Sequence, residues 1–284
     1  MKHIKIFILM FLLVNFLCSG CGDGTYVAEK MFWKANNKLQ KLVEKEKHNE
    51  NIEKEEMDAL IFSFKEITLR YPYWKSAPLA YFNLAMIYEM KNDSEGARKQ
   101  YELICKTFPH QDAICVAALK NIAVLYERAD NWDEAEKTYK KISTAYPYTE
   151  IGLMVPFYLA QQYKKRGESE KSGLAFRSAL KTYKDAIENS QSEMVKIVSL
   201  NYAVSCMLYL EGEEEAIAFL KSLSDREVGP IIQACAVFNI AKIYHYHLKN
   251  KEEAVKYYQQ IVEKYPEGDL AKKAIEEIKE LSKE

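Results

Sequence analysis

The sequence has little glycine, with ten residues among 284. Loops that wrap phosphate groups depend on glycine-rich turns, so such loops are scarce in this chain. The motifs G-x-x-x-x-G-K-S/T, G-x-G-x-x-G, H-E-x-x-H and G-x-S-x-G are all absent from it. The usual sequence evidence for a nucleotide-binding enzyme, a zinc hydrolase or a serine hydrolase is therefore missing.

The chain also has few groups arranged for catalysis. His245 and His247 are two residues apart, and such a pair on a helix points to different faces and cannot readily chelate one metal. Acid pairs such as Glu252 and Glu253 lie at expected helix starts, where the helix dipole favours them. We expect a non-catalytic protein without cofactor or metal. An enzyme accessory protein with an unrecognised site is the alternative from another class.

No excess of positive charge is present. Removal of residues 1–20 takes away Lys2 and Lys5 from the 40 Lys and Arg, which leaves 38 against 41 acidic residues, a net charge of −3. Nucleic acid is therefore not an expected partner. The charges are interleaved, and 48% hydrophobic residues with 12% aromatics are ample for a packed core.

Cysteine gives little evidence of a disulfide framework. Beyond the first 21 residues the cysteines are Cys105, Cys115, Cys206 and Cys235, an even number that formally permits two disulfides. No C-x-x-C spacing occurs among these four. We expect buried free thiols, because cysteine is among the most buried residue types.

Long hydrophobic runs are also absent, except near the start of the chain. Lys2, His3 and Lys5 precede an apolar stretch over 6–17, which is too short for the roughly twenty residues that cross a bilayer in a helix. We expect residues 1–20 to be a signal peptide. The stretch from Leu17 to Cys21, Leu-Cys-Ser-Gly-Cys, resembles the lipobox of bacterial lipoproteins.

In that family the thiol corresponding to Cys21 receives diacylglycerol, so the resemblance implies a membrane anchor at Cys21 and a tether over 21–27. Leu17 lies four residues before Cys21 instead of the usual three, where Cys18 sits. Ordinary cleavage that releases a soluble protein is the alternative. Gly22, and no aspartate, follows the cysteine, which favours the outer membrane in a bacterium with two membranes.

An internal repeat organises residues 28–284. Ala85 to Ala123 is 38 residues, Ala123 to Ala160 is 37, and Ala203 to Ala241 is 38. A tyrosine follows three residues after the alanine in four units, at Tyr88, Tyr126, Tyr163 and Tyr244. A second small residue comes next, followed four residues later by a large one: Ala97 and Tyr101, Ala135 and Tyr139, Ser172 and Phe176, Ala216 and Leu220, Ala254 and Tyr258.

Each unit is expected to be a helical hairpin. Polar breaks separate the two small residues, and an aromatic residue before proline ends several units, because proline stops a helix. These unit ends are Tyr71-Pro72, Phe108-Pro109, Tyr146-Pro147 and Tyr265-Pro266. The unit around Ala160 lacks this proline and continues in helical period through Leu180, Tyr183 and Ile187, which predicts a longer second helix there.

This pattern resembles the tetratricopeptide repeat. The resemblance implies an all-α, right-handed solenoid of about six helical pairs, closed by a capping helix over 269–283. With the lipobox, it is similar to the tetratricopeptide lipoproteins of outer-membrane β-barrel assembly and to Tol-Pal coordinator proteins. It implies a scaffold in the periplasm-facing cell envelope with protein or peptide partners.

Asparagine recurs two residues before the first alanine of a unit, at Asn83, Asn121, Asn201 and Asn239. In tetratricopeptide proteins the first helices line the concave surface, where an amide could both donate to and accept from a bound peptide. Apolar and basic residues would complete the groove: Phe82, Met86, Lys120, Phe157, Phe238 and Lys242. The alternative is that each asparagine ties one repeat to the next.

Overall fold

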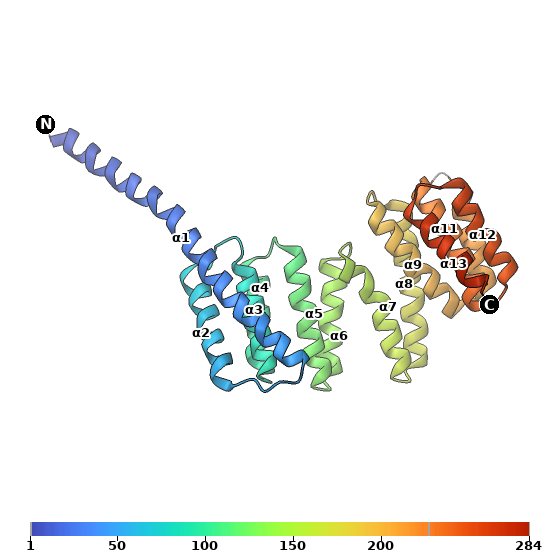
Figure 1. Ribbon diagram of the computed structural model, residues 1–284, viewed down its shortest axis with the longest axis horizontal. Helices are drawn as coiled ribbons and strands as arrows, with labels where there is room; N and C mark the ends of the chain where they lie inside the picture. Colours follow the sequence, from blue (N-terminus) through green and yellow to red (C-terminus); the bar gives the residue numbers. More distant parts are fainter. Residues whose placement is uncertain (1, 227, 284) are drawn as a thin grey trace. The chain divides into compact units, whose positions relative to one another are not determined.

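The computed structural model describes residues 2–226 and 228–283, with side chains from Gly24 onward. In this part of the chain every regular element is helical (Figure 1), so the all-α prediction is confirmed. The elements are α1 (Lys2–Lys47), α2 (Lys54–Arg70), α3 (Ala77–Met90), α4 (Ser94–Thr107), α5 (Asp112–Arg128), α6 (Trp132–Ala145), α7 (Glu150–Lys165), α8 (Ser169–Asn189), α9 (Glu193–Leu210), α10 (Glu213–Ser224), α11 (Pro230–Lys242), the π-helical turn η1 (Ile243–His247), α12 (Lys251–Lys264) and α13 (Asp269–Leu281).

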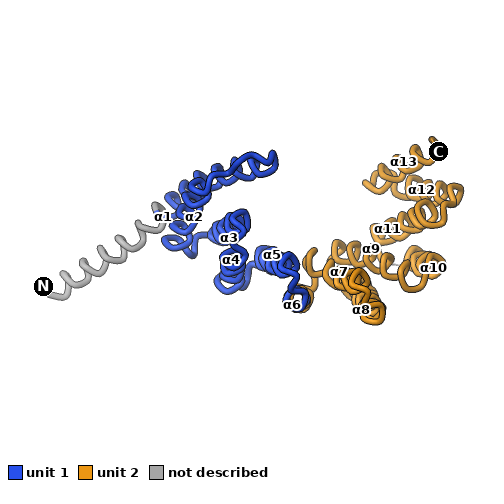
Figure 2. Tube along the Cα trace, turned by 90° about the horizontal axis from the view of Figure 1, so that it is seen from below, with its two compact units in different colours: residues 1–138 blue, residues 139–284 orange. Residues whose placement is uncertain are grey.

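The chain forms two compact units, residues 1–138 and 139–284 (Figure 2). Unit 1 holds α1 to α5 and the start of α6, and unit 2 holds the rest of α6 and the helices after it. Within each unit, consecutive helices pack as hairpins joined by short turns. Among the described residues from Gly24 on, no helix is long and apolar enough to cross a membrane.

The small residues of the repeat are the points where the two helices of a hairpin touch. Ala85 and Ala97 are both fully buried, and so are the corresponding residues of the other hairpins. Where serine replaces alanine, the Ser172 hydroxyl donates to the Ala160 carbonyl at 3.0 Å, so the buried polar group is satisfied. The large residues four positions later are at most 2% exposed and fill the space beside these contacts.

The turns between paired helices share one backbone feature. A residue with positive φ stands within each polar break, and the second helix begins one or two residues later. Asp93, Asn131 and Asn250 then cap their helices by accepting a backbone amide hydrogen three residues on. The left-handed positions are Asn92, Asp130, Gly167, Gly212 and Lys249.

The predicted helix ends are confirmed. α4 ends at Thr107 before Phe108-Pro109, and α12 ends at Lys264 before Tyr265-Pro266. Without such a proline, α8 runs for 21 residues and buries Tyr183 and Ile187. At the end of the chain, α13 places Ala274 and Leu281 in a core cluster with Tyr258 of α12.

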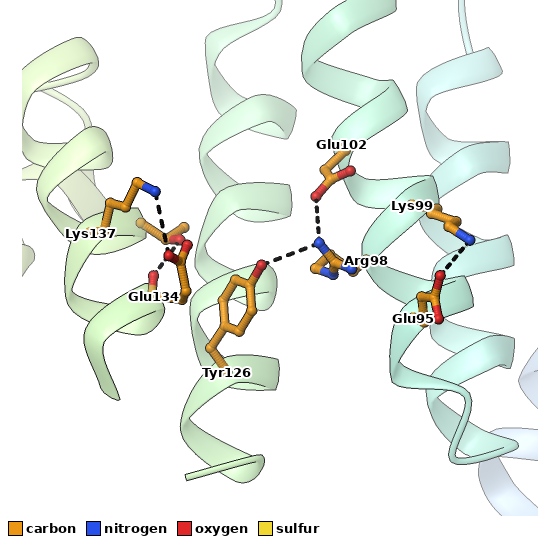
Figure 3. A network of polar contacts seen from close by, with 8 residues as sticks. Glu95, Arg98, Lys99, Glu102, Tyr126, Glu134 and Lys137 are labelled. Carbon is orange, nitrogen blue, oxygen red and sulfur yellow. Dashed lines mark hydrogen bonds and ion pairs between the residues drawn. The ribbon is translucent and has the colours of Figure 1, made fainter. Parts of the chain in front are cut away.

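Tyrosines of the repeat connect one hairpin to the next in unit 1. Lys65 of α2 lies over the Tyr88 ring of α3 at 5.5 Å from its centroid. One hairpin later, Arg98 of α4 lies 5.7 Å from the Tyr126 centroid and donates to its hydroxyl at 3.2 Å (Figure 3). A cation above an aromatic face is attracted by the ring's quadrupole, so these contacts add to the apolar packing between repeats.

Candidate functional site

Three of the four repeated asparagines, Asn83, Asn201 and Asn239, join first helices of neighbouring hairpins within their units. In unit 1 the Asn83 amide donates to Asn36 Oδ1 at 3.1 Å, which links α3 to α1. In unit 2 the Asn239 amide donates to Asn201 Oδ1 at 3.1 Å and to the Cys235 carbonyl at 2.9 Å. The second bond is internal to α11, whereas the first links α11 to α9. These amides therefore lie side by side on consecutive first helices.

Asn121 has a different environment. Its amide donates to the Tyr101 hydroxyl at 2.9 Å, and that hydroxyl donates to Glu89 Oε1 at 2.7 Å. Arg128 completes the network with a bond to Glu89 Oε2 at 2.9 Å. Tyr101 is fully buried, and burial together with the Glu89 carboxylate raises the pKa of its phenol. The Asn121 amide thus satisfies a buried group and ties α5 to the α3–α4 hairpin.

The phenylalanines of the predicted groove belong mainly to the hairpin cores. Phe82, Phe157 and Phe238 are all partly buried, and each ring meets the large residue of its own second helix edge-on. The pairs are Phe82 with Tyr101 at 5.1 Å, Phe157 with Phe176 at 5.7 Å, and Phe238 with Tyr258 at 5.5 Å between ring centroids. Only Phe238 of the three also lines one of the two grooves described next.

Four of the ten predicted groove residues, Asn201, Phe238, Asn239 and Lys242, come together in a groove of unit 2. It has a volume of about 550 Å³ and lies between α9, α11 and α13. Asn201 and Asn239 lie at its wall, and Leu208 and Phe238 contribute apolar surface. Its full lining is Ile197, Asn201, Val204, Ser205, Leu208, Cys235, Phe238, Asn239, Lys242, Ile243, Tyr246, His247, Leu270 and Lys273.

Two lysines give this groove a positive character. Lys242 of α11 and Lys273 of α13 both line it and are both exposed. Neither ammonium group forms an ion pair with any residue in the described part of the chain. Unpaired lysines beside amides and apolar side chains can bind an extended peptide that carries a carboxylate. The repeat pattern identified Lys242 but not Lys273, because α13 lies outside the repeat.

A second groove lies in unit 1 and contains Asn83 and Met86. Its volume is about 980 Å³, and its other lining residues come from α1 and the segment after it. Lys45 at its edge pairs with Glu56 at 2.9 Å, and this bond raises the pKa of the Lys45 ammonium. Asn36, the hydrogen-bond partner of Asn83, was not predicted. The charged insertion over 44–56 displaces the first hairpin from the repeat spacing. An alignment of the repeat alanines therefore does not identify Asn36 as equivalent to the other asparagines.

The other predicted residues lie apart from these grooves. Lys120 is exposed on α5, and Asn121, Phe82 and Phe157 serve the packing described above. Cys21 lies outside the residues whose side chains the structure describes. Cys18 also lies outside them. Of the four cysteines with described side chains, Cys115 and Cys206 are buried, as the sequence predicts, whereas Cys105 and Cys235 are only partly buried.

The two histidines near the unit 2 groove lie in the π-helical turn η1. His245 Nδ1 lies 3.2 Å from Glu277 Oε2, and His247 Nδ1 lies 3.8 Å from Glu213 Oε1. The two rings thus approach acids of different helices, α13 and α10. Among residues 24–226 and 228–283, no three His, Cys, Asp or Glu side chains are grouped to hold a metal ion.

Comparison with known proteins identifies the repeat. A profile for the tetratricopeptide repeat matches residues 79–110 and 236–268, and a second profile for the same repeat matches 118–147. These stretches contain most of α3 with α4, most of α11 with η1 and α12, and most of α5 with α6. Tetratricopeptide stacks present extended binding surfaces, so the chain contains a protein-interaction module. No curated protein sequence matches the chain.

Several solved structures are similar to the chain. Yeast Tom70 is 14% identical with a TM-score of 0.47, over 87% of this chain and 47% of Tom70. Human IFIT1, solved as a dimer with m7Gppp-AAAA, is 15% identical with a TM-score of 0.44, over 78% and 48%. TTC0263, a thermophilic tetratricopeptide protein of Thermus thermophilus, is 20% identical with a TM-score of 0.38, over 70% and 98%. The chain spans about half the length of the Tom70 and IFIT1 chains.

Proposed function

We propose that the protein is a non-catalytic scaffold of the bacterial cell envelope. A lipid on Cys21 holds it at the outer membrane, facing the periplasm, and the groove of unit 2 binds extended segments of partner proteins. The observation that carries this proposal is the groove itself, where the Asn201–Asn239 pair meets two unpaired lysines and the apolar surface of Leu208. Components of outer-membrane protein assembly are the first partners to test.

The groove chemistry favours an acidic, extended ligand. Backbone groups of a peptide can pair with free donor and acceptor positions of the two asparagine amides. A side-chain or terminal carboxylate would meet Lys242 or Lys273, and charge-assisted bonds of this kind are roughly twice as strong as neutral ones. Leu208 and Phe238 offer contact for one apolar side chain of the ligand.

Site-specific crosslinking in cells tests the groove. A photoreactive amino acid in place of Leu208 should capture a protein that a matched probe at Leu174, exposed on α8 and absent from the groove lining, does not capture. Mass spectrometry then identifies the captured protein. Lys242→Glu with Lys273→Glu should abolish the adduct, because the charge of the groove is reversed. Equal capture at both probe positions would contradict specific binding in the groove.

The asparagines provide a second test with purified partner. Asn239→Ala should weaken partner affinity by about two- to tenfold, because one hydrogen bond contributes about 0.5–1.5 kcal/mol. Asn121→Ala should instead lower the melting temperature and leave affinity unchanged, since its amide serves the buried Tyr101 hydroxyl. If Asn239→Ala changes only the melting temperature, the paired amides are structural and the groove proposal is wrong.

The anchor is tested separately. Mass spectrometry of protein from the membrane fraction should find an acylated amino terminus at Cys21. Cys21→Ala should leave the chain unprocessed or mislocalised. An unmodified amino terminus at any later residue in that fraction would refute the lipid anchor, while the groove experiments would keep their meaning.

A further inference from the structure

The middle of α1 has an exposed aromatic edge. Tyr26 and Trp33 are 65% and 64% exposed, and their spacing of seven residues puts them on nearly the same side of the helix. On the opposite side, Ala28, Ala35 and Leu39 are at most 3% exposed and pack in unit 1. The aromatic side chains are therefore on the face that unit 1 leaves uncovered.

A row of lysines runs beside this edge. Lys30, Lys34, Lys38 and Lys41 are all exposed, and spacings of four, four and three place them on one face. Glu29 is the single acidic residue between positions 24 and 43, although acids outnumber bases by one over the whole chain. None of the four ammonium groups forms an ion pair with a described residue.

This arrangement differs from that on α4, where Lys99 pairs with Glu95 at 2.6 Å, a common arrangement on a solvated helix face. On α1 the lysines instead adjoin Tyr26 and Trp33. Helices that lie in a membrane interface combine lysines with aromatic side chains at the headgroup level, and their lysines attract anionic lipid.

We propose that this face of α1, formed by Tyr26, Trp33 and the four lysines, lies on the surface of an anionic bilayer and orients unit 1 against it. The inference rests on the lipid anchor proposed above. Tyr26 follows Cys21 by five residues, so even an extended chain keeps it within about 18 Å of the anchored residue. Each lysine near such a surface contributes roughly fivefold to binding.

The tryptophans of the chain make the contact measurable. Only three are present, and Trp74 and Trp132 are 9% and 8% exposed, so Trp33 is the accessible one. The full chain is reconstituted into vesicles with brominated acyl chains, either phosphatidylcholine alone or mixed with phosphatidylglycerol, and only floated, vesicle-bound protein is measured. Fluorescence should be quenched, more strongly in the anionic vesicles, and less as salt rises. Trp33→Phe should remove the quenched component.

Lysine variants test the role of charge. Replacement of Lys30, Lys34 and Lys38 by glutamine should remove the preference for anionic vesicles. The same change at Lys181, Lys221 and Lys279, which are exposed on other helices, is the matched control and should preserve it. Equal quenching in both lipids, or loss of the preference in both variants, would overturn the electrostatic contact.

Two further results would overturn the proposal. Unquenched Trp33 in vesicle-bound protein would show that the face stays in water, whether or not Cys21 is acylated. In detergent solution, protection of Trp33 from acrylamide that grows with protein concentration would show that a second copy covers the face. Because acylation is read by mass spectrometry, failure of the contact is distinguished from failure of the anchor.

Discussion

The Tyr183 hydroxyl bonds two backbone groups of α7. It donates to the Leu153 carbonyl at 2.6 Å and accepts from the Phe157 amide at 3.1 Å, two groups that would pair with each other in a regular helix. Pro156, inside α7, immediately precedes Phe157 and crowds the carbonyl four residues earlier, so it opens this turn. Burial of the hydroxyl raises the pKa of Tyr183 above its usual value.

Tyr183→Phe removes only one oxygen atom, but it should destabilise the protein strongly. Two backbone groups lose their partner in a site where the side chain is fully buried. An unpaired buried group costs about 1–3 kcal/mol, so we expect about 2–4 kcal/mol after partial closure of the helix. At about 2–4 °C for each kcal/mol, the melting temperature should fall by at least about 4 °C.

Thermal unfolding followed by circular dichroism measures this loss. Tyr202→Phe is the matched control, because its half-buried ring stacks on Tyr183 with centroids 5.4 Å apart and loses the same atom. In a Pro156→Ala background the helix can close its own bond, so Tyr183→Phe should cost about 1 kcal/mol less there. A loss as small as that of the control, or one unchanged by Pro156→Ala, would refute the reasoning.

Three smaller effects are expected. Burial raises the pKa of Cys206 to about 12. An alkylating reagent at pH 8 should therefore modify this thiol only after denaturation, as read by mass spectrometry. Rapid labelling of the native protein would contradict its burial. Lys249 has a φ of 53°, a left-handed conformation that is unfavourable for any residue with a Cβ atom. Lys249→Gly should therefore raise the free energy of unfolding by about 0.5–1 kcal/mol in thermal melts. A lower stability would mean that the lysine side chain stabilises the fold by more than the backbone strain costs. Arg226 lowers the pKa of Glu188, so the pair adds stability at neutral pH that is lost as pH falls through that lowered value. Both side chains are about half exposed, so Glu188→Gln should cost at most about 0.5 kcal/mol at pH 7 and nothing measurable in 1 M salt; a cost that persists in high salt would refute the electrostatic origin.

The repeat could be read from the sequence because its residues act locally. The residues equivalent to Ala85 and Ala97 need only be small in every hairpin. The Phe108-Pro109 pair ends its helix whatever the surrounding tertiary structure. These requirements recur at fixed spacing, so comparing the chain with itself reveals them. The hairpins were predictable for this reason, whereas the long α8 and the final helix α13 were predicted from their own helical periodicity.

The chemistry between hairpins was harder to predict. Asn121 and Asn239 occupy the same repeat position, yet one amide meets the Tyr101 hydroxyl and the other meets Asn201. The difference depends on the neighbouring hairpin, because Tyr101 supplies the hydroxyl that Asn121 bonds. The repeat spacing alone does not show that these two side chains meet. The bond of Tyr183 to α7 spans thirty residues and depends on the placement of two helices, so no local rule predicts it.

The turn residues have a consequence for how such a chain can change during evolution. Each hairpin closes through its own left-handed residue and its own contact between small side chains, so its internal geometry does not depend on how many hairpins precede it. Duplication or loss of a segment between two aromatic-proline boundaries would change the number of hairpins and preserve the shape of each one. In four of these turns the left-handed residue lies two positions before the second helix, and that position is occupied by asparagine, aspartate, glycine and lysine, so one protein shows four different residues at the same backbone position.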